Sequence, residues 1–282
     1  MSRGRRFGLT RPNLRQVRVI AAVVVGALAA TSLAVFAYLS RGYPANRVDL
    51  NDAGVWVTND ARGLFGRLNK SVSSLDAYFN PTGGAQTAYT LDVVQDGATV
   101  LGWDRAAGKL SPVNVATARL VDDGSVPMSS TMILAMRAGT LATLDPLTGK
   151  VWAIRYSPES PAPMSLSGVA AGSRPLAELG GPPKDLVLKE GARFADLTVD
   201  SVGSVYAATI AGKAVTIPVE GGQLLEPVGS EAPKRESIEL TAVGAHVAAL
   251  DVIGGTLAVD DHAPAKRAEL GAGARLQLPG AD

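Results

Sequence analysis

The chain has 282 residues and no cysteine, which excludes thiolate zinc sites, cysteine nucleophiles and disulfide bonds. Its formal charge of +1 hides an asymmetry, because residues 1–41 hold seven arginines and no acid. Subtracting these seven from the 27 basic residues leaves 20 against 26 acids, so residues 42–282 have a net charge of −6. This acidic body without a basic stripe argues against nucleic acid as a partner.

The first predicted element is a transmembrane helix over residues 19–39. These 21 residues carry no charge, and as a helix they would span about 31 Å, close to the ~30 Å of a bilayer core. Six arginines precede the segment, so the positive-inside rule places residues 1–18 as a basic cytoplasmic tail. We therefore predict a single-pass plasma-membrane protein, with the lipid bilayer as one partner, a linker at 40–47 and an extracytoplasmic C-terminal body.

The rival interpretation of this segment is a cleaved signal peptide. Residues 32–34 and 35–37 have the small-x-small pattern that signal peptidase recognises. Signal peptides usually have an apolar region of only about 7–15 residues, however. The longer run here favours an uncleaved anchor.

The body, residues 48–260, contains a repeat in which a glycine opens a strand and a second glycine turn follows some nine to eleven residues later. The first glycines of the five copies are separated by 43, 42, 64 and 41 residues, and they are Gly54, Gly97, Gly139, Gly203 and Gly244. The long gap includes residues 157–184, a stretch rich in Pro, Ser and Gly that we predict to be an inserted surface loop. A period of 41–43 residues with two strands per copy is typical of a β-propeller blade.

The predicted fold class is therefore one N-terminal transmembrane helix followed by an all-β domain that is β-propeller-like, complete or incomplete. The alternative is a set of β-sandwich modules, which also have short strands and frequent turns. Regular spacing and the lack of a period near 90–100 residues favour the propeller. Residues 261–282 are interpreted either as a tail or as the start of a further unit.

Residues 48–59, VDLNDAGVWVTN, followed by GRLN at 66–69, carry a resemblance to a known family. They are similar to the N-terminal region of large actinobacterial envelope proteins that have one membrane helix, a propeller-like region and then fibronectin type III or Ig-like modules. The resemblance covers the anchor and most of the body, while the fibronectin modules are missing from these residues. It implies an envelope scaffold whose partners are other envelope proteins or cell-wall polymers, and it transfers no catalytic residue.

Few residues suggest chemistry. His246 lies in a predicted strand and His262 in a turn, and two histidines 16 residues apart without cysteine do not make a zinc site. No serine has a nucleophile-elbow motif. Residues 49–60 faintly resemble a calcium loop, but Ala53 stands where an oxygen ligand is needed, so a turn with Asx hydrogen bonds is favoured.

Glycine pairs and tryptophans are the remaining candidates for ligand binding. The pairs at 83–84 and 180–181 lack the Lys-Ser/Thr that a phosphate loop requires. Trp56, Trp103 and Trp152 fall in equivalent predicted strand regions, and we expect them to pack between blades. No catalytic, cofactor-binding or metal-binding residue is predicted, and no cofactor.

These observations predict a non-enzymatic scaffold or binding protein, with the 157–184 loop as its binding surface. One alternative is a propeller-fold lyase or hydrolase acting on an envelope polysaccharide or peptide, which would need a cluster of Asp or His side chains near the propeller axis. Another is a ligand-sensing ectodomain that signals across the membrane.

Overall fold

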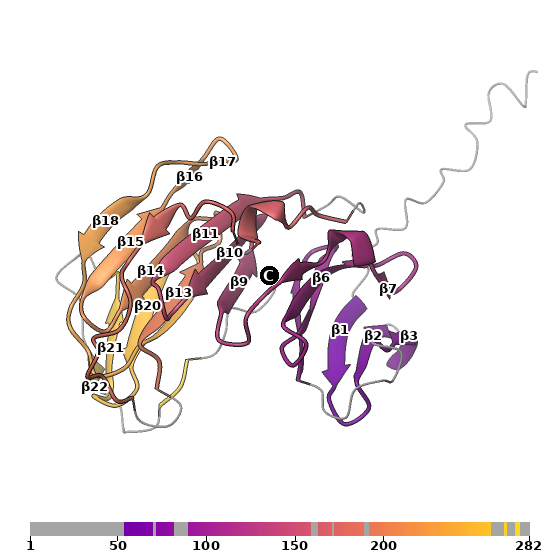
Figure 1. Cartoon of the computed structure of the whole chain (residues 1–282), viewed down its shortest axis with the longest axis horizontal. Coiled ribbons are helices and arrows are strands. Elements are labelled where there is room, and N and C mark those ends of the chain that lie inside the picture. The colour runs from indigo at the N-terminus through magenta and orange to yellow at the C-terminus, as the bar shows by residue number, and fades with distance from the viewer. Residues whose placement is uncertain are drawn as a thin grey trace, which may run out of the picture. The chain divides into compact units, whose positions relative to one another are not determined.

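The structure is a computed structural model that describes residues 54–69, 72–81, 90–158, 163–170, 172–188, 192–260, 268–269 and 274–276 (Figure 1). The chain divides into two compact units, residues 1–49 and 50–282, and the fold below is that of the second. The predicted tail, transmembrane helix and linker lie outside the described residues. Within the described ranges, no helix has the length and apolar character needed to cross a bilayer.

The described residues form an all-β domain of successive antiparallel sheets, which confirms the predicted class. The first sheet contains β1 (Gly54–Asn59), β2 (Leu64–Asn69) and β3 (Ser74–Phe79). The second contains β4 (Leu91–Asp96), β5 (Thr99–Asp104), β6 (Lys109–Asn114), β7 (Arg119–Leu120) and β8 (Val126–Pro127). The third contains β9 (Ile133–Arg137), β10 (Thr140–Asp145), β11 (Lys150–Arg155) and β12 (Ala177–Glu178).

Two further four-stranded sheets follow along the chain (Figure 1). The fourth contains β13 (Ala195–Val199), β14 (Val205–Thr209), β15 (Lys213–Ile217) and β18 (Val228–Glu231), with the small hairpin β16 (Val219–Glu220) and β17 (Gln223–Leu224) inserted before β18. The fifth contains β19 (Glu239–Val243), β20 (His246–Asp251), β21 (Thr256–Val259) and β22 (Ala268–Glu269). The sheets thus follow one another in chain order, as blades do.

One hairpin turn repeats in all five sheets. It ends in a glycine whose φ lies between 61° and 88°, the left-handed region where other residues are strained, and these glycines are Gly63, Gly108, Gly149, Gly212 and Gly255. Four of the five turns begin with Asn or Asp, whose side-chain oxygen accepts an N–H from within the turn, and these are Asn59, Asp104, Asp145 and Asp251. The predicted second glycine turn of each copy is therefore confirmed as a hairpin with common chemistry.

The hairpins confirm the alignment of the five copies, because the strand that each first glycine opens is the one that enters the hairpin. They make β1 the counterpart of β5, β10, β14 and β20, which are the second strands of their sheets. Gly54 therefore starts a second strand, whereas the other four first glycines lie in the turn between a first and a second strand. In the described residues, the first sheet has no strand at the position that β4 and β9 occupy in theirs.

Side chains between neighbouring sheets form the core, which is the packing of propeller blades. One cluster joins the first two sheets through Trp56, Val100 and Val113, and a second joins the next two through residues such as Trp103 and Leu141. The largest cluster runs from the third sheet to the fifth. The second, third and fourth sheets each lie between two neighbours, and their second strands β5, β10 and β14 are buried along nearly their whole length.

The tryptophans are buried between sheets as expected, with exposed fractions of 9% or less. Their positions are not equivalent, because Trp56 and Trp103 lie on second strands while Trp152 lies on the third strand of its sheet. Trp152 donates its indole N–H to the carbonyl of Ser173 at 3.1 Å.

The 157–184 segment is only partly a surface loop. It supplies β12, the outermost strand of the third sheet, and its residues Leu166, Val169 and Leu179 are buried. Isolated apolar residues among prolines and serines give no periodic signal, so the packing is hidden in the sequence. In the 261–282 region, β22 completes the fifth sheet, and Leu276 donates its backbone N–H to Glu239 on β19.

Candidate binding groove

A cavity of about 780 Å³ runs along the first strands of three sheets and is called the axial groove below. Its walls come from residues 92–95 of β4, 133–137 of β9 and 195–199 of β13, and Leu240 of β19 also contributes. These strands lie side by side within the domain. The groove is therefore built by segments about 40 to 60 residues apart in sequence.

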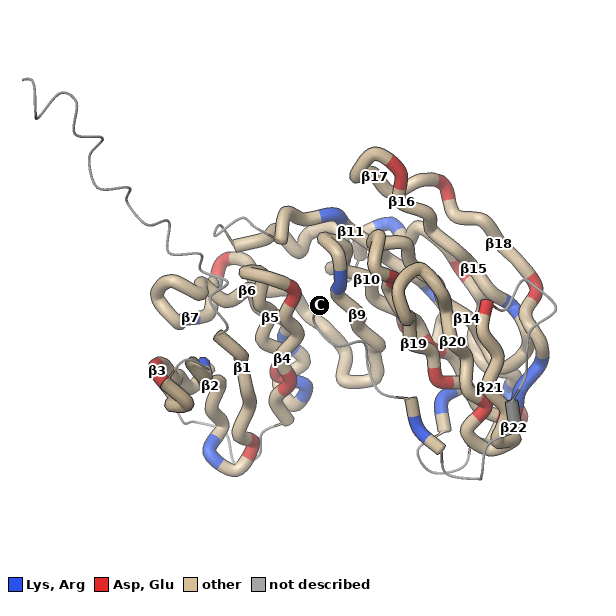
Figure 2. Tube along the Cα trace, turned by 180° about the vertical axis from the view of Figure 1, so that it is seen from behind, with Lys and Arg blue, Asp and Glu red and all other residues tan. Residues whose placement is uncertain are grey.

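Antiparallel pairing decides which loops surround one end of the groove. The start of each first strand and the turn between the second and third strands fall at the same end of a sheet, as the pair Leu91 and Asp104 shows. The residues that gather at this end, which we call the mouth, are residues 130–132 and 146–147 together with Pro182, Leu186, Leu188, Ala192 and Arg193. Figure 2 shows the charged residues mostly at turns and strand ends, while the strands themselves are largely uncharged.

The lining of the groove combines polar and apolar residues, and several of its apolar side chains are only partly buried. Val94, Leu134, Leu186 and Leu188 line it, and each is of intermediate exposure although it packs against a core cluster. Partly exposed apolar side chains that converge on one concavity are the usual lining of a small-molecule site.

An ordered arginine stands at the mouth on the second sheet. The Arg105 guanidinium lies 3.9 Å from the ring centre of Trp103 and donates to Asp92 at 3.0 Å. The other carboxylate oxygen of Asp92 accepts the backbone N–H of Val93 at 2.9 Å. Stacking on an aromatic ring and pairing with a carboxylate fix the guanidinium with little remaining freedom.

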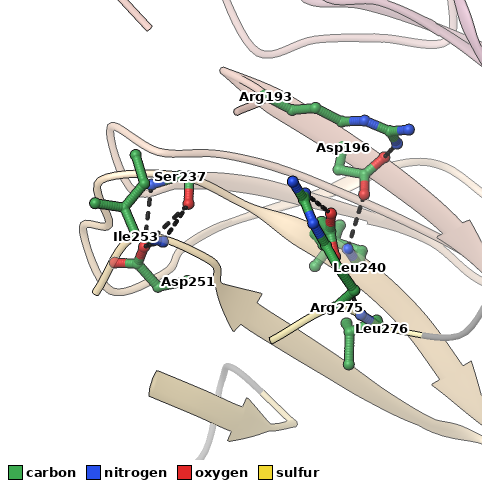
Figure 3. Close-up of polar contacts among 9 residues, drawn as sticks. Arg193, Asp196, Ser237, Leu240, Asp251, Ile253, Arg275 and Leu276 are labelled. Atoms are coloured by element: carbon green, nitrogen blue, oxygen red, sulfur yellow. Dashed lines mark hydrogen bonds and ion pairs between the residues drawn. The ribbon is translucent and has the colours of Figure 1, made fainter. Parts of the chain in front are cut away.

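A second arginine stands at the mouth on the fourth sheet, where Figure 3 shows its contacts. Arg193 donates to Asp196 at 3.1 Å, and the second oxygen of Asp196 accepts the backbone N–H of Leu240 at 2.8 Å. Burial raises the pKa of Asp196 to about 6, although Arg193 and the Leu240 N–H oppose the shift. Half of the Arg193 side chain remains exposed.

The raised pKa of Asp196 predicts a stability that falls as pH rises. An aspartate in the unfolded chain has a pKa of about 3.9, so between about pH 4 and 6 the folded state holds more protons than the unfolded state. Over this range the free energy of unfolding should drop by on the order of 3 kcal/mol relative to the Asp196→Asn variant. Chemical unfolding of both chains at pH 4 and 7 measures this, and a pH-independent difference would contradict it.

His246 does not line the groove. His246 is exposed at the start of β20, with Nδ1 2.8 Å from Asp260, and His262 lies outside the described residues. Across the described ranges, no three His, Asp or Glu side chains come together as a metal site would require.

The segments that resemble calcium or phosphate loops in the sequence make structural contacts elsewhere in the domain, as far as they are described. Asp60, the last position of the calcium-like segment, accepts the N–H of Leu91 at 2.9 Å and so links the first sheet to the second. Residues 49–52 and the glycine pair at 83–84 lie outside the described residues. The pair at 180–181 packs against the turn that ends at Gly149.

Sequence reasoning missed the four charged residues at the mouth, namely Asp92, Arg105, Arg193 and Asp196. Arg193 and Asp196 are three residues apart, which is a weak signal in a strand. Asp92 and Arg105 are 13 apart, and only the pairing of β4 with β5 brings them together. The register of the hairpin was the signal that could have located this pair.

Comparison with known proteins gives likeness to solved structures alone, since no family model and no curated protein matches. A virginiamycin B lyase from Staphylococcus aureus is 10% identical, with a TM-score of 0.45 over 77% of this chain and 66% of that one. Hydrazine synthase of Kuenenia stuttgartiensis is 10% identical, with a TM-score of 0.45 over 79% and 64%. The dihydro-heme d1 dehydrogenase NirN is 12% identical, with a TM-score of 0.45 over 81% and 44%.

Proposed function

We propose that this chain is a membrane-tethered, extracytoplasmic binding protein of the cell envelope, non-enzymatic, with the axial groove as its binding site. The observation that carries the binding role is the groove itself, a concavity of about 780 Å³ with partly exposed apolar walls and arginines at its mouth. Such a cavity has the size and lining of a ligand site.

The acids of the groove support binding over catalysis. Both oxygens of Asp92 and both of Asp196 already accept a hydrogen bond from the chain itself. A general acid or base must instead reach a proton of the substrate. The arrangement is thus better suited to holding the arginines in place than to the lyase or hydrolase chemistry that the sequence left open.

The membrane and envelope parts of the proposal rest on the sequence. Residues 19–39 are uncharged and follow six arginines, and the resemblance of residues 48–59 is to anchored envelope proteins. The partners on this proposal are the bilayer and either envelope proteins or cell-wall polymers. The 157–184 segment borders the groove through Pro182, so its C-terminal end remains part of the proposed binding surface.

The lack of cysteine makes the topology testable with single substitutions. Val187 is 91% exposed and lies between Leu186 and Leu188, which line the groove, while Ser2 lies in the predicted cytoplasmic tail. We expect Val187→Cys in the full chain to react with a membrane-impermeant maleimide on intact cells. Ser2→Cys should react only after permeabilisation, and the protein should stay in carbonate-washed membranes. Release by carbonate, or the reverse labelling pattern, would overturn the topology.

The binding role has its own test. A benzophenone attached at Val187→Cys should crosslink to an envelope component on illumination of intact cells. The same group at Val228→Cys is the control, because Val228 is 57% exposed on β18 and does not line the groove. Equal crosslinking at both positions, or none at either, would contradict binding at the groove.

A further inference from the structure

We infer that the axial groove binds an extended peptide segment of a partner protein, which adds as a strand to the unpaired edge of β9. The side chains of this segment are uncharged and small or apolar. The inference rests on the proposed binding function and names the chemical class of the ligand.

The backbone edge of β9 faces the groove. β9 is the end strand of the third sheet and pairs with β10 on one side only (Figure 1). All five of its residues, 133–137, line the groove. Because successive side chains point to opposite faces of a sheet, five consecutive lining residues mean that the groove runs along the edge of the strand. Four of the five are of intermediate exposure, so a ligand can reach this edge.

The turn after β9 determines which of its backbone groups point away from β10. Residues 138–139 form a two-residue turn with positive φ at both positions, and Arg137 pairs with Thr140 across it. The closing pair of such a turn is hydrogen-bonded, and the pattern alternates along the strands. The N–H and C=O of Leu134 and Met136 therefore point into the groove. Across the described residues, neither backbone has a hydrogen-bond partner on that side.

Hydrogen bonds on β19 support this direction. β19 also ends in a two-residue turn. Leu240 donates its N–H to Asp196 at 2.8 Å. The Ala242 carbonyl accepts from Arg137 at 3.1 Å. Both groups thus point away from β20, and they occupy the same positions before the turn as the two groove-facing residues of β9. On β19 these groups have partners, whereas on β9 they are open.

The other two strands that line the groove are less accessible. The residues of β13 are at most 4% exposed, so a ligand cannot reach their backbone. On β4, the Asp92 carboxylate already accepts the backbone N–H of Val93 at 2.9 Å. β9 therefore carries the most open edge in the groove.

The volume and the charges of the groove fit one uncharged strand. A strand of five residues is about 17 Å long, and with ~4.8 Å between strands and ~10 Å between layers it takes up about 800 Å³. The groove has a volume of about 780 Å³. At the mouth, Arg105 pairs with Asp92 and Arg193 pairs with Asp196. The ligand therefore needs no net charge.

Apolar residues flank the open edge on both faces of the third sheet. Leu134 packs against the core cluster that contains Trp103, while Ile133 and Ala135 pack against the cluster that contains Leu197. An added strand would direct its alternate side chains to these two faces. Small or apolar side chains fit there. An alkyl chain would instead cover the open N–H and C=O groups without bonding to them, which is unfavourable.

The test uses the full chain in nanodiscs and a mixture of acetylated, amidated pentapeptides of Ala, Val and Leu with a central benzophenone. Crosslinks should map to β9 and to its neighbours in the groove, β4 and residues 186–188. Binding should also slow the hydrogen exchange of the Leu134 and Met136 N–H groups. Crosslinks elsewhere would place the site outside the groove, and equal competition by dodecanol would mean an apolar site without backbone recognition.

N-methylated competitors test pairing through the backbone. In an added strand only alternate N–H groups face β9. In the best-binding pentapeptide, methylation of one alternate set should weaken competition by about tenfold or more, while methylation of the other set should have little effect. Equal effects of the two sets, or no effect of either, would overturn strand addition.

A proline variant tests the same contact from the protein side. Leu134→Pro removes the groove-facing N–H, which takes no part in the pairing with β10, and should weaken the pentapeptide by about tenfold. Leu134→Ala is the matched control, because it keeps the N–H and should retain most of the binding. Equal losses would assign the effect to the side chain and contradict the inference.

Two measures keep the outcomes distinguishable. Melting temperatures check that both variants are folded, and the N-methylated series still decides the question if Leu134→Pro unfolds. Failure of every pentapeptide with continued crosslinking from Val187→Cys would leave the binding function standing and refute only the ligand class.

Discussion

Replacing Gly149 by alanine should lower the free energy of unfolding by about 4 kcal/mol or more. Gly149 has φ +72°, and a Cβ atom there would lie 2.3 Å from the carbonyl oxygen of Gly180 and 2.5 Å from its nitrogen. These are backbone atoms of the segment that follows β12, so no side chain can move aside. The N–H of Leu179 also donates to the Gly149 carbonyl at 2.7 Å, which holds the two segments together.

The matched control is Gly108→Ala. Gly108 ends the equivalent turn of the second sheet with φ +63°, but its added Cβ would meet only the Met128 carbonyl oxygen at 3.4 Å, an ordinary contact. We expect a loss of about 1–2 kcal/mol, the cost of the left-handed conformation alone. Chemical unfolding of both variants measures the difference. Equal losses would mean that the Gly180 contact is relaxed at little cost.

Replacing Asp251 by alanine is the second change with a large expected effect, a loss of about 3–5 kcal/mol. Its carboxylate is buried and accepts five hydrogen bonds, from the backbone of Glu236, Ser237, Ile253 and Gly254 and from the Ser237 hydroxyl. Figure 3 shows the bonds from Ser237 and Ile253. Alanine would take this acceptor away from the buried backbone N–H and hydroxyl of Ser237, and from three partly buried N–H groups. The segment that leads into β19 and the hairpin between β20 and β21 would then lose the carboxylate that connects them.

The pKa of Asp251 gives this prediction a pH dependence. Burial alone would raise the pKa, but the hydrogen bonds from Gly254, Glu236 and Ser237 lower it below its ordinary value. A carboxyl whose folded-state pKa is lowered stabilises the protein above its unfolded pKa and loses this effect as pH falls through the folded value. The difference between wild type and Asp251→Ala should therefore shrink under acidic conditions.

The control for Asp251 is Asp145→Ala in the same turn of the third sheet. Asp145 accepts only local bonds, from the Leu147 N–H and the Thr148 hydroxyl, and both are exposed. We expect a loss of about 1 kcal/mol. If both variants lost the same amount, the turn itself and not the link to the neighbouring strand would account for the role of Asp251.

Much of the fold was accessible from the residues because hairpin turns are local. The sequence Asp145-Pro-Leu-Thr-Gly149 contains the residue that starts the turn and the glycine that ends it, so no distant contact is needed to predict the strands on either side. The five copies align correctly because each first glycine opens the strand that enters this hairpin. The buried Leu166 and Val169 were missed because no period marks a short irregular segment.

The groove could not be predicted in the same way. Its chemistry depends on which strand of each sheet lies innermost and on which side chains then face one another. Asp196 and Leu240 come from neighbouring sheets and are 44 residues apart, yet they share a hydrogen bond of 2.8 Å. A long-range contact of this kind depends on how whole sheets pack against one another. The conformational preferences of neighbouring residues carry no information about that packing.

By itself, the sequence determined the charge asymmetry, the uncharged 19–39 segment and the repeated glycine hairpin, because composition and turn chemistry act over a few neighbouring residues. The tertiary structure alone decided that Arg105 stacks on Trp103 beside Asp92, that Asp196 is buried beneath Arg193, and that apolar residues of three sheets line one cavity. The physical reason is that burial and ion pairing are properties of the packed sheets, set by register and by the order of the strands.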